Sequence, residues 1–336
     1  WAFVIDLSRF MIHRWPTGRY LLQLLRLLAD GQFHSGEELG AVLGVSRAAI
    51  WKQLEQLREE KGVRLHKVRG KGYRLEQALS LLSAERLSSR LMGLKICIAE
   101  QVDSTNALAL RQLQDMAPPY LVLAEAQSAG RGRRGRQWVS PYGENLYFTQ
   151  VVRIERAATQ LQALSLVVGL AVLHTLRQLG VSGAGLKWPN DVLVGTKKIA
   201  GILLELTGDP ADVCHVVIGI GINANMLAAD GVDQPWTSIR LETGLVVDRN
   251  ELVIALAEQL QRHLAAHREG GFAMFQQEWE SNHLWQGCEV RLISGVHEVL
   301  GSVRGVTVDG ALRLLVGGRE EVFSGGELSL RLRHDS

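Results

Sequence analysis

The sequence predicts an α+β protein of several domains: a small helical unit, then a mixed sheet with helices, then a β-barrel. Three observations support this prediction. Short helices with polar caps meet at a glycine near the N-terminus, strand-like and helix-like stretches alternate from about residue 94, and apolar and polar positions alternate from Glu289 onward. The 336 residues are enough for two or three domains.

Composition narrows the class of protein. Hydrophobic residues make up 46% of the chain and charged residues 21%, which is ordinary for a water-soluble globular protein. The formal net charge of +2 says little about partners, because the basic residues cluster locally. Three widely spaced cysteines predict neither a disulfide framework nor a zinc site and favour a cytoplasmic location. No apolar stretch is long and unbroken enough to span a bilayer, so we expect no membrane partner.

Residues 1–16 are expected to be an extension of unknown role. They lack a lysine-rich start and a small-residue cleavage site, so they make a poor signal peptide. Met11 is closer to where a natural start is expected, and we assign the extension no function.

Three short helices are predicted next. The first is apolar and covers residues 19–29, Ser35 caps the second, and the third covers 47–58 after a break at Gly44 and a cap at Ser46. Two helices joined by a tight glycine turn, the second with an exposed basic end, form the helix-turn-helix pattern.

A basic hairpin follows these helices. Residues 67–72 lie between strand-like residues 63–65 and 73–75, as in a wing that reaches toward phosphates. Residues 17–76 are therefore interpreted as a winged helix-turn-helix DNA-binding domain. The alternative is a small helical packing module whose charges are merely solvated. The expected DNA contacts are Ser46, Arg47, Ala48, Trp51, Lys52, Arg69 and Lys71.

A linker is expected over residues 77–93, with a short helix over 79–91. The pattern changes to strands near Leu94, so we expect the central domain to cover 94–284.

The central domain opens with a strand over 95–99, followed by Asp103-Ser-Thr-Asn106 and a helix over 107–116. These four polar residues form a good helix cap. They also lie where they can hydrogen-bond a small polar ligand, and the sequence leaves both interpretations open.

An Arg/Gly-rich loop is the most distinctive feature of the central domain. Four arginines and three glycines lie between Gly130 and Arg136, flanked by strand-like residues 120–124 and 145–154. Glycine weakens helices and strands, the guanidinium groups repel one another, and arginine matches phosphate and carboxylate oxygens. We expect a loop, mobile when empty, that orders around a phosphate-bearing ligand. A solvated RNA-binding tail is the alternative, but a tail is not expected between two strands.

A second candidate site lies at Lys187-Trp-Pro-Asn-Asp191. The proline forces an extended backbone, which leaves Asn190 and Asp191 at a strand edge. There Asp191 is expected to hold Mg²⁺ or to orient an arginine.

A hairpin follows, with strands over 192–194 and 198–205. Lys198 begins its second strand and either reaches back into the site or is simply solvated at the hairpin end. A strand over 213–222 then ends in a Gly/Asn-rich tip with Asn223.

The remaining elements of the central domain are mostly helical. A long apolar helix over 161–179 is expected to be buried against the sheet, and helices are expected over 249–268 and 271–282. A polar loop over 226–240 is expected to act as a lid, with Trp236 as a stacking residue. Residues 285–333 then alternate as in a small β-barrel, and the Asp309-Gly310 pair is a hairpin signal.

Taken together, these motifs resemble those of the bifunctional biotin–protein ligase family, whose members with a winged helix also act as the biotin operon repressor. The resemblance covers residues 17 to about 330 and implies a class II tRNA synthetase-like mixed sheet with helices and an SH3-like C-terminal barrel. Its motifs are Asp103-Ser-Thr-Asn106, Gly130-Arg-Gly-Arg-Arg-Gly-Arg136, Lys187-Trp-Pro-Asn-Asp191, Lys198-Ile-Ala-Gly-Ile-Leu-Leu-Glu205 and Gly219-Ile-Gly-Ile-Asn223.

The resemblance implies a two-step reaction. The biotin carboxylate attacks the α-phosphate of ATP, with Mg²⁺, to give biotinoyl-5′-AMP, and the biotin then passes to a lysine of biotin carboxyl carrier protein of acetyl-CoA carboxylase. It implies catalytic roles for Arg133, Arg136 and Lys198, and a metal-binding or lysine-orienting role for Asp191. The implied ligand-binding residues are Ser104, Thr105, Asn106, Gln127, Gly130, Arg131, Gly132, Arg133, Lys187, Trp188, Asn190, Lys198, Gly201 and Asn223.

The resemblance also implies that operator DNA is a partner and that the adenylate-bound protein is a homodimer. Two rival interpretations remain at this point. One is a lipoate–protein ligase, and the other is a transcription regulator that senses a ligand without turning it over.

Overall fold

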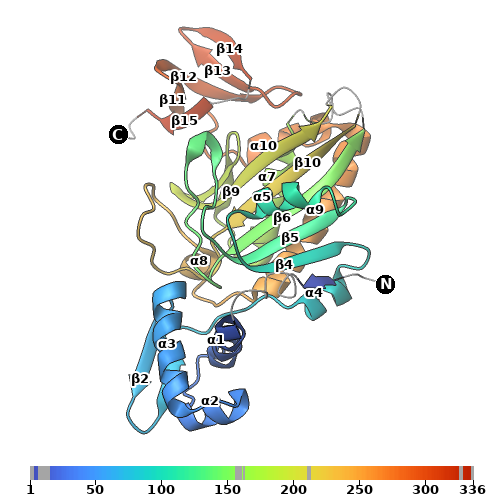
Figure 1. The fold of residues 1–336 in the computed structure, drawn as a ribbon. Coiled ribbons are helices and arrows are strands. Elements are labelled where there is room, and N and C mark those ends of the chain that lie inside the picture. Colours follow the sequence, from blue (N-terminus) through green and yellow to red (C-terminus); the bar gives the residue numbers. More distant parts are fainter. Residues whose placement is uncertain are drawn as a thin grey trace.

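The computed structural model shows three units stacked end to end, which follow the order of the sequence from residue 16 onward (Figure 1). The winged helix-turn-helix lies at one end, an eight-stranded sheet with helices forms the middle, and a five-stranded sheet lies at the other end. The structure describes residues 4–6, 16–155, 161, 163–209, 213–324 and 328–333.

Three helices and a two-stranded wing form the N-terminal unit, as the sequence predicts. They are α1 (Pro16–Leu28), α2 (Gly36–Leu43), α3 (Arg47–Lys61), β2 (Leu65–Val68) and β3 (Gly72–Leu75). One side of each helix is apolar, and the side chains of Leu24, Ile50 and Leu57 are completely buried between them.

Local capping fixes the turn between α2 and α3. Ser35 and Glu38 form a capping box at the start of α2, and the Ser46 hydroxyl accepts a hydrogen bond from the Ala49 N–H at 3.2 Å. Gly44 ends α2 with a φ of 68°, a conformation that glycine adopts readily. The tight turn predicted from the sequence is confirmed.

The central sheet is mixed. β1 and β5 both pair with β4 in parallel, and the remaining pairs are antiparallel. In their order across the sheet, the strands are β1 (Val4–Asp6), β4 (Lys95–Val102), β5 (Tyr120–Gln127), β6 (Leu146–Glu155), β10 (Val213–Ile222), β9 (Lys197–Gly208), β8 (Asp191–Val194) and β7 (Ala184–Lys187).

β1 was not expected from the sequence. Residues 4–6 of the predicted extension add a parallel strand at the edge of the sheet, with Ile5 opposite Cys97. Residues 1–3 and 7–15 of that extension lie outside the described part of the chain.

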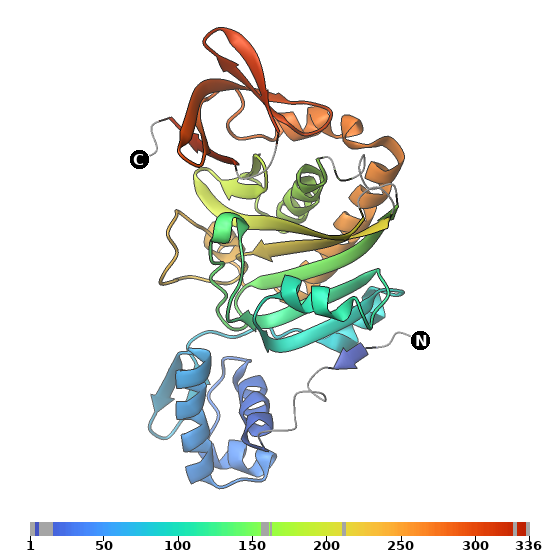
Figure 2. The ribbon, with the colours of Figure 1, turned by 45° about the horizontal axis from the view of Figure 1, so that its top comes forward.

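Helices cover both faces of the central sheet (Figure 2). Their bounds are α4 (Ala84–Arg90), α5 (Thr105–Gln112), α7 (Leu164–Gln178), α8 (Ile239–Thr243) and α9 (Arg249–Gly270). Side chains of β5 alternate between the faces: Tyr120 and Val122 pack with α5, whereas Leu121 and Leu123 join the larger core under α7 and α9. α7 is therefore the buried central helix that the sequence predicts.

The helix expected to begin at Ala107 starts earlier, at Thr105, with Ser104 at its N-cap position. The Ser104 side chain makes no capping hydrogen bond, so the helix-cap interpretation does not hold for this residue. Ser104, Thr105 and Asn106 are instead buried at the end of the sheet.

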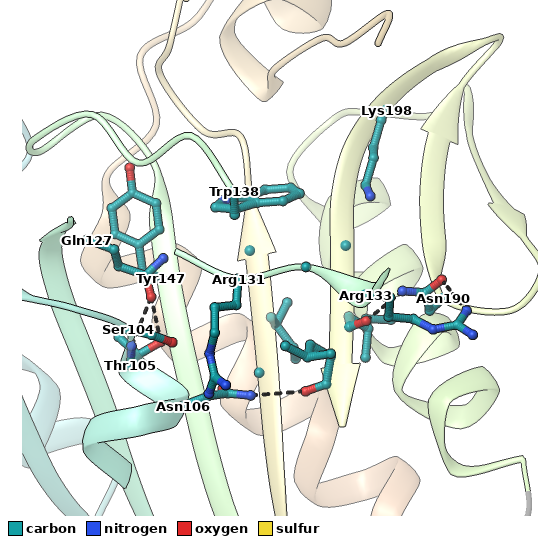
Figure 3. A pocket seen from close by; sticks show the side chains of 17 residues that line it. Ser104, Thr105, Asn106, Gln127, Arg131, Arg133, Trp138, Tyr147, Asn190 and Lys198 are labelled. Atoms are coloured by element: carbon teal, nitrogen blue, oxygen red, sulfur yellow. Dashed lines mark hydrogen bonds between the residues drawn. The ribbon is translucent and has the colours of Figure 1, made fainter. Parts of the chain in front are cut away.

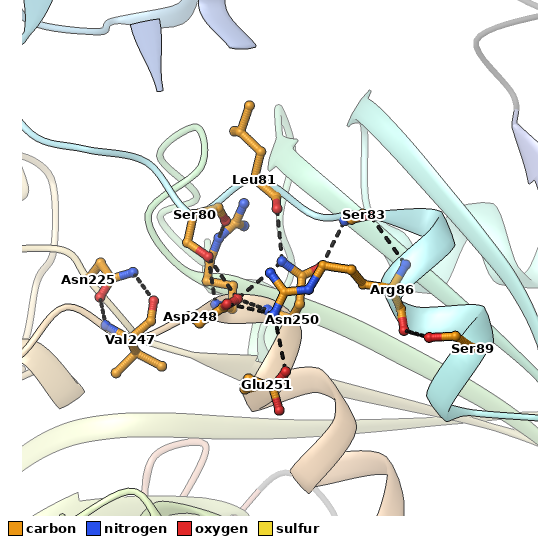
Figure 4. Close-up of polar contacts among 11 residues, drawn as sticks. Ser80, Leu81, Ser83, Arg86, Ser89, Asn225, Val247, Asp248, Asn250 and Glu251 are labelled. Atoms are coloured by element: carbon orange, nitrogen blue, oxygen red, sulfur yellow. Dashed lines mark hydrogen bonds and ion pairs between the residues drawn. The ribbon is translucent and has the colours of Figure 1, made fainter. Parts of the chain in front are cut away.

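The predicted linker is fastened to the first turn of α9 (Figure 4). Asn250 accepts a hydrogen bond from the Ser83 N–H at 2.7 Å and donates one to the Leu81 carbonyl at 3.0 Å. These bonds engage main-chain groups just before the helix begins. The helix expected over 79–91 starts only with α4, where the N-cap Ser83 accepts a hydrogen bond from the Arg86 N–H at 3.3 Å.

The C-terminal unit is an antiparallel sheet of five strands with the order β14-β13-β12-β11-β15. The expected helix over 271–282 divides into a 3₁₀ turn and a short helix, while the hairpin predicted at Asp309-Gly310 joins β12 to β13. The elements are η3 (Phe272–Met274), α10 (Gln276–Ser281), β11 (Glu289–Ser294), β12 (His297–Val306), β13 (Leu312–Val316), β14 (Arg319–Phe323) and β15 (Leu328–Leu332). In the part of the chain that the structure covers, no helix is both long and apolar enough to cross a membrane.

Candidate active site

A pocket lies over the middle of the central sheet, between the start of α5 and the Arg/Gly-rich loop (Figure 3). Most of the ligand-binding residues named from the sequence line it, including residues from four different stretches of the chain. The lining residues are Ser104, Thr105, Asn106, Gln127, Arg131, Gly132, Arg133, Trp138, Tyr147, Asn190, Lys198, Gly201, Ile202, Leu203, Gly219, Ile220 and Gly221.

One end of the pocket is a network of buried polar side chains. Gln127 Oε1 accepts hydrogen bonds from the backbone N–H and the hydroxyl of Thr105 at 2.9 and 3.2 Å. The Thr149 hydroxyl lies 2.8 Å from that of Thr105 and 2.7 Å from Asn106 Oδ1. Because these groups satisfy one another away from water, their orientations are fixed. The network can therefore recognise a small polar head group.

Glycines on β10 leave space above the sheet backbone at the floor of the pocket. A Cβ at Gly219 would overlap the Asn106 amide, and a Cβ at Gly221 would lie 2.5 Å from Trp138 Cε2. The Gly/Asn-rich end of β10 therefore lets α5 and the Trp138 ring approach the sheet backbone.

The Arg/Gly-rich loop is folded back on itself. The Gly132 N–H donates to the Arg136 carbonyl and the Trp138 N–H to the Gly130 carbonyl, both at 2.8 Å. A short 3₁₀ turn, η2 (Arg133–Gly135), forms its tip. The predicted mobility of the empty loop stays a prediction.

Two arginines tie this loop to the sheet. Arg131 Nη2 lies 3.0 Å from Glu205 Oε2, and Arg133 Nη1 donates to Asn190 Oδ1 at 3.2 Å. The second contact joins the two candidate sites that the sequence identified separately. Figure 3 shows Arg131 extending across the pocket toward Asn106.

Lys198 lines the other end of the pocket and belongs to a lysine–carboxylate cluster whose other members, Asp191 and Lys187, lie behind it and do not line the pocket. Asp191 Oδ1 lies 2.7 Å from Lys198 Nζ, and Asp191 Oδ2 lies 4.0 Å from Lys187 Nζ. Burial acts to raise the pKa of Asp191, but the two lysines outweigh it and hold that pKa below its ordinary value. Burial lowers the pKa of Lys187 to about 8, and Asp191 offsets only part of that effect. Lys198 Nζ also lies 5.4 Å from the Trp138 ring centroid.

These contacts do not form a metal site. Among the residues that the structure describes, no three His, Cys, Asp or Glu side chains gather where they could hold a metal ion. Asp191 already faces two lysines, so its surroundings fit the orienting role better than the Mg²⁺ role that the sequence suggested.

Four of the predicted ligand-binding residues do not line this pocket. The side chain of Trp188 is 1% exposed, because it packs into the core shared with the C-terminal sheet. Its Nε1 donates a hydrogen bond to the Gly310 carbonyl at 3.0 Å. Lys187 lies over the Trp285 ring, 4.6 Å from its centroid. Gly130 lies in an adjoining groove, together with Arg136, which was predicted to be catalytic.

Asn223, the fourth of these residues, supports the loop over 226–240. Its amide donates to the Thr237 carbonyl at 2.9 Å, and the Lys198 N–H donates to the Pro235 carbonyl at 2.9 Å. Trp236 is therefore held beside Lys198 by a bridge between the two backbones. The stacking and lid roles of this loop remain predictions.

Sequence reasoning missed Trp138, Tyr147, Thr149 and Glu205. Trp138 follows directly on the Arg/Gly-rich loop, and Glu205 ends the motif that begins at Lys198, so both lay beside motifs already identified. Tyr147 and Thr149 look like ordinary strand residues, and only the alternation of β6 brings both to the pocket side.

The seven predicted DNA-contacting residues are all exposed on α3, at its N-cap or on the wing. Trp51 is 52% exposed, which agrees with its predicted outward position. An exposed tryptophan among basic side chains suits a surface that meets another molecule.

Comparison with known proteins identifies the family. The model of the biotin/lipoate A/B protein ligase family matches residues 98–223, and an HTH domain model matches residues 20–74. Bifunctional ligase/repressor BirA of Escherichia coli (strain K12) is 41% identical over 312 residues, covering 92% of this chain and 97% of the relative. The chain belongs to the biotin/lipoate A/B protein ligase family.

Other relatives agree with this membership. Bifunctional ligase/repressor BirA of Bacillus spizizenii is 31% identical, covering 85% of this ligase and 90% of the relative. The structure of biotin protein ligase from Aquifex aeolicus in complex with biotin and ATP matches with a TM-score of 0.63 at 30% identity, covering 70% of this chain and 98% of that one. The chain is a biotin ligase that carries a DNA-binding helix-turn-helix domain.

Proposed function

We propose that this ligase joins biotin to ATP, forming biotinoyl-5′-AMP and pyrophosphate, and then transfers biotin to a lysine of biotin carboxyl carrier protein. One observation carries the proposal: a buried polar network and Lys198, which pairs with Asp191 behind it, lie at opposite ends of one cavity that a cationic loop covers.

The two ends of the cavity fit the two parts of the intermediate. Thr105, Asn106 and Gln127 offer fixed donors and acceptors to the ring system of biotin. The carboxylate of biotin then points toward Lys198, where an anionic acyl-phosphate would lie. Biotin is favoured over lipoate because its ring system carries N–H and C=O groups that can hydrogen-bond the polar side chains at this end, whereas the dithiolane ring of lipoate has none.

In the first step, a carboxylate oxygen of biotin forms a bond to the α-phosphorus of ATP, and the bond to the leaving pyrophosphate breaks. Both reactants are anionic, so cations must offset the charge that gathers between them. Lys198, Arg133 and Arg136 supply these cations. We assign Mg²⁺ to the triphosphate, as part of the substrate, because no group of His, Cys, Asp or Glu side chains that could hold a metal ion gathers around Asp191 in the described part of the chain.

In the second step, the neutral amine of the acceptor lysine attacks the acyl carbon, the bond from that carbon to the phosphate oxygen of AMP breaks, and the proton lost from the nitrogen passes to solvent. Asp191 is the carboxylate placed to orient the incoming ammonium, since it already holds Lys198 and Lys187. The covering loop keeps water away from the mixed anhydride until the lysine arrives.

Mass spectrometry tests this function. The biotin acceptor domain of acetyl-CoA carboxylase, incubated with this protein, biotin and MgATP, should gain one biotinyl group on a single lysine, with release of pyrophosphate. A ligand sensor without turnover would give neither product, and that result would overturn the proposal.

A second function concerns transcription. We propose that the adenylate-bound protein forms a homodimer whose two winged helices bind the half-sites of an operator. The exposed basic residues of α3 and the wing support this idea. Adding biotin and MgATP should increase self-association in analytical ultracentrifugation, and unchanged association would contradict it.

A further inference from the structure

The joint between the N-terminal unit and the central domain is very short. The Leu79 N–H donates to the Ala29 carbonyl at 2.8 Å, just after α1 ends, so Leu79 is held by the N-terminal unit. The next residue, Ser80, is held by the central domain. Its carbonyl accepts from Arg249 Nε at 2.7 Å, and its hydroxyl accepts from the Arg249 N–H at 2.8 Å. Neighbouring residues are therefore bound by different units, and no residue lies between them to act as a hinge.

The main chain stays bound to the central domain over the next three residues. Asn250 donates to the Leu81 carbonyl at 3.0 Å and accepts from the Ser83 N–H at 2.7 Å (Figure 4). Between these two contacts, the Leu82 N–H donates to Glu125 Oε1 at 2.7 Å. We call residues 80–83 the strap. Each of its four residues has a main-chain group bound by a side chain of the central domain.

The side chains that hold the strap are themselves fixed. Arg249 is completely buried, forms an ion pair with Glu125 and donates to the Asn145 carbonyl at 2.9 Å. The side chain of Asn250 is 1% exposed. Because buried polar groups that satisfy one another have few alternative arrangements, this network gives the strap one position on the central domain.

Packing on the wing side does not fix the orientation of the N-terminal unit. A cavity of about 380 Å³ separates the base of the wing from residues 139–142 and 227–230 of the central domain. One polar contact crosses beside it, from Arg240 Nη1 to Gln77 Oε1 at 2.5 Å. A pair of long side chains can follow a change in angle between the units, so the strap is the main constraint on that angle.

We propose that the strap makes the N-terminal unit and the central domain one rigid body, and that Asn250 is the positioning residue that holds it. In the proposed homodimer, the separation of the two winged helices is then set by the protein rather than by the DNA. The operator is recognised by the spacing of its half-sites as well as by their sequence. This inference rests on the proposed dimeric operator binding, but the strap itself can be tested without ligand or DNA.

A fixed joint favours one half-site spacing over all others. The second half-site then meets a winged helix already in position, so its effective concentration is high at that spacing and falls steeply elsewhere. Four released residues could extend by up to about 13 Å. An insertion of two base pairs adds about 7 Å of DNA length, so a released strap could follow it and a bound strap could not.

Hydrogen exchange of the ligand-free full chain tests the strap directly. The Leu82 N–H lies outside any helix or strand, and in the wild type it should still be protected. In Asn250→Ala its exchange should speed about 10- to 100-fold although its own acceptor, Glu125, is unchanged, because the loss of two hydrogen bonds frees the strap as a unit. The Leu79 N–H should keep its protection, since Ala29 holds it from the other side.

Asn225→Ala is the matched control. Asn225 is also buried and also makes two main-chain hydrogen bonds, donating to the Val247 carbonyl at 2.9 Å and accepting from the Val247 N–H at 2.8 Å. It lies near the same helix end but holds a different segment (Figure 4). Exchange at Leu82 should stay at the wild-type rate in this variant.

A spacing series tests the consequence for DNA. The probe is an inverted-repeat duplex selected from random sequence with the wild-type protein, biotin and MgATP. Affinity per dimer is measured for this duplex, for the same duplex with two base pairs inserted at its centre, and for one half-site alone. The insertion should weaken binding of the wild type and Asn225→Ala about 30-fold or more, but binding of Asn250→Ala less than about threefold. All three proteins should bind the single half-site equally.

Several outcomes would overturn the inference. Unchanged exchange at Leu82 in Asn250→Ala would show that Asn250 does not hold the strap. An equal effect of the insertion on the wild type and on Asn250→Ala would show that the strap does not set the spacing, and weaker binding of the single half-site would place the effect in the N-terminal unit itself.

A second variant covers a failure of Asn250→Ala to fold. Asn250→Asp keeps the oxygen that accepts from Ser83 but loses the donor to the Leu81 carbonyl, so it should show the same pattern with smaller changes. If the wild type selects no inverted repeat, the operator proposal and the spacing role both fail. The exchange rates would still decide whether Asn250 holds the strap.

Discussion

Lys198 Nζ lies 2.7 Å from Asp191 Oδ1, and this ion pair joins two neighbouring strands at the pocket end where an acyl-phosphate would form. Both side chains are largely buried. A buried pair of this kind is held by mutual attraction, and each partner is left uncompensated when the other is removed. Because Lys198 is assigned to the first half-reaction and Asp191 to the second, a change in either residue should affect both half-reactions.

Replacing Lys198 with glutamine should slow adenylation by about 100-fold or more, because a cation near the reacting phosphate is lost. Biotin affinity should change little, since the polar end of the pocket is untouched. Pyrophosphate release measures the first quantity and calorimetry with biotin the second. Lys197→Gln is the control, because Lys197 is exposed on the same strand. Equal loss in both variants would remove Lys198 from its assigned role.

Alanine at Gly219 should weaken biotin binding by about 10- to 100-fold, because the added methyl group displaces the Asn106 amide from a pocket built on fixed hydrogen bonds. The free energy of unfolding should fall by less than the free energy of biotin binding, because a shift of the Asn106 side chain makes room for the methyl group. Gly183→Ala is a suitable control, because its Cβ would meet only Val194 Cγ1 at an ordinary 3.5 Å. Calorimetry with biotin decides, and wild-type affinity in Gly219→Ala would contradict the assigned pocket.

Stability should rise with pH above about pH 8 because of Lys187. Burial lowers the pKa of Lys187 from 10.5 to about 8. Below about pH 8 the folded protein therefore carries a buried positive charge, and the desolvation of that charge reduces the stability of the fold. Between the two values the unfolded chain binds a proton that the folded chain has released, which favours the folded state as pH rises. The gain is on the order of 2–4 kcal/mol, at about 1.4 kcal/mol per pKa unit.

Urea unfolding at about pH 7 and about pH 10 measures this gain. In Lys187→Met the rise should be smaller than in wild type, whereas exposed Lys197→Met should keep it. An identical pH slope in wild type and Lys187→Met would show that Lys187 is not the group responsible.

Sequence patterns could predict the elements because each depends on neighbours in the chain. Ser35, Ser46 and Gly44 set the helix ends and the tight turn locally, and all three were identified. The Ser83 hydroxyl caps α4 locally by accepting a hydrogen bond from the Arg86 N–H at 3.3 Å, but the chain just before α4 is also held by Asn250, which lies in a helix much later in the sequence. No local pattern could reveal that contact.

The candidate site likewise contains some residues that sequence patterns could predict and others that they could not. Motif residues such as Thr105, Gln127 and Lys198 come together as expected, because Thr105 begins a helix, Gln127 ends a strand and Lys198 lies at the start of another strand. Trp188 shares a motif with Asn190 and yet lies in the core, since a turn of three residues points successive side chains in different directions. Glu205 reaches the pocket only through the packing of β9 beneath the loop.

The core position of Trp188 can be tested by Trp188→Phe. The variant should lose about 1–3 kcal/mol of unfolding free energy, from a lost hydrogen bond to the Gly310 carbonyl and a small cavity. Biotin affinity should stay near the wild-type value, because the ring does not line the pocket. Trp51→Phe, on the exposed face of α3, should leave stability unchanged. A selective loss of biotin affinity in Trp188→Phe would restore the ligand-binding role that the sequence suggested.

The last prediction concerns DNA. Lys52→Gln should weaken binding to every DNA sequence and reduce the slope of log affinity against log salt by about one, as expected when one phosphate contact is lost. Arg58→Gln is the matched control, because Arg58 lies on the same helix but pairs with Glu55 at 2.7 Å near the far end. Fluorescence anisotropy with operator and with unrelated DNA across a salt series gives both quantities. If Lys52→Gln and Arg58→Gln have the same salt slope as wild type, α3 does not meet the phosphates through its N-terminal end, and the wing becomes the better candidate for that contact.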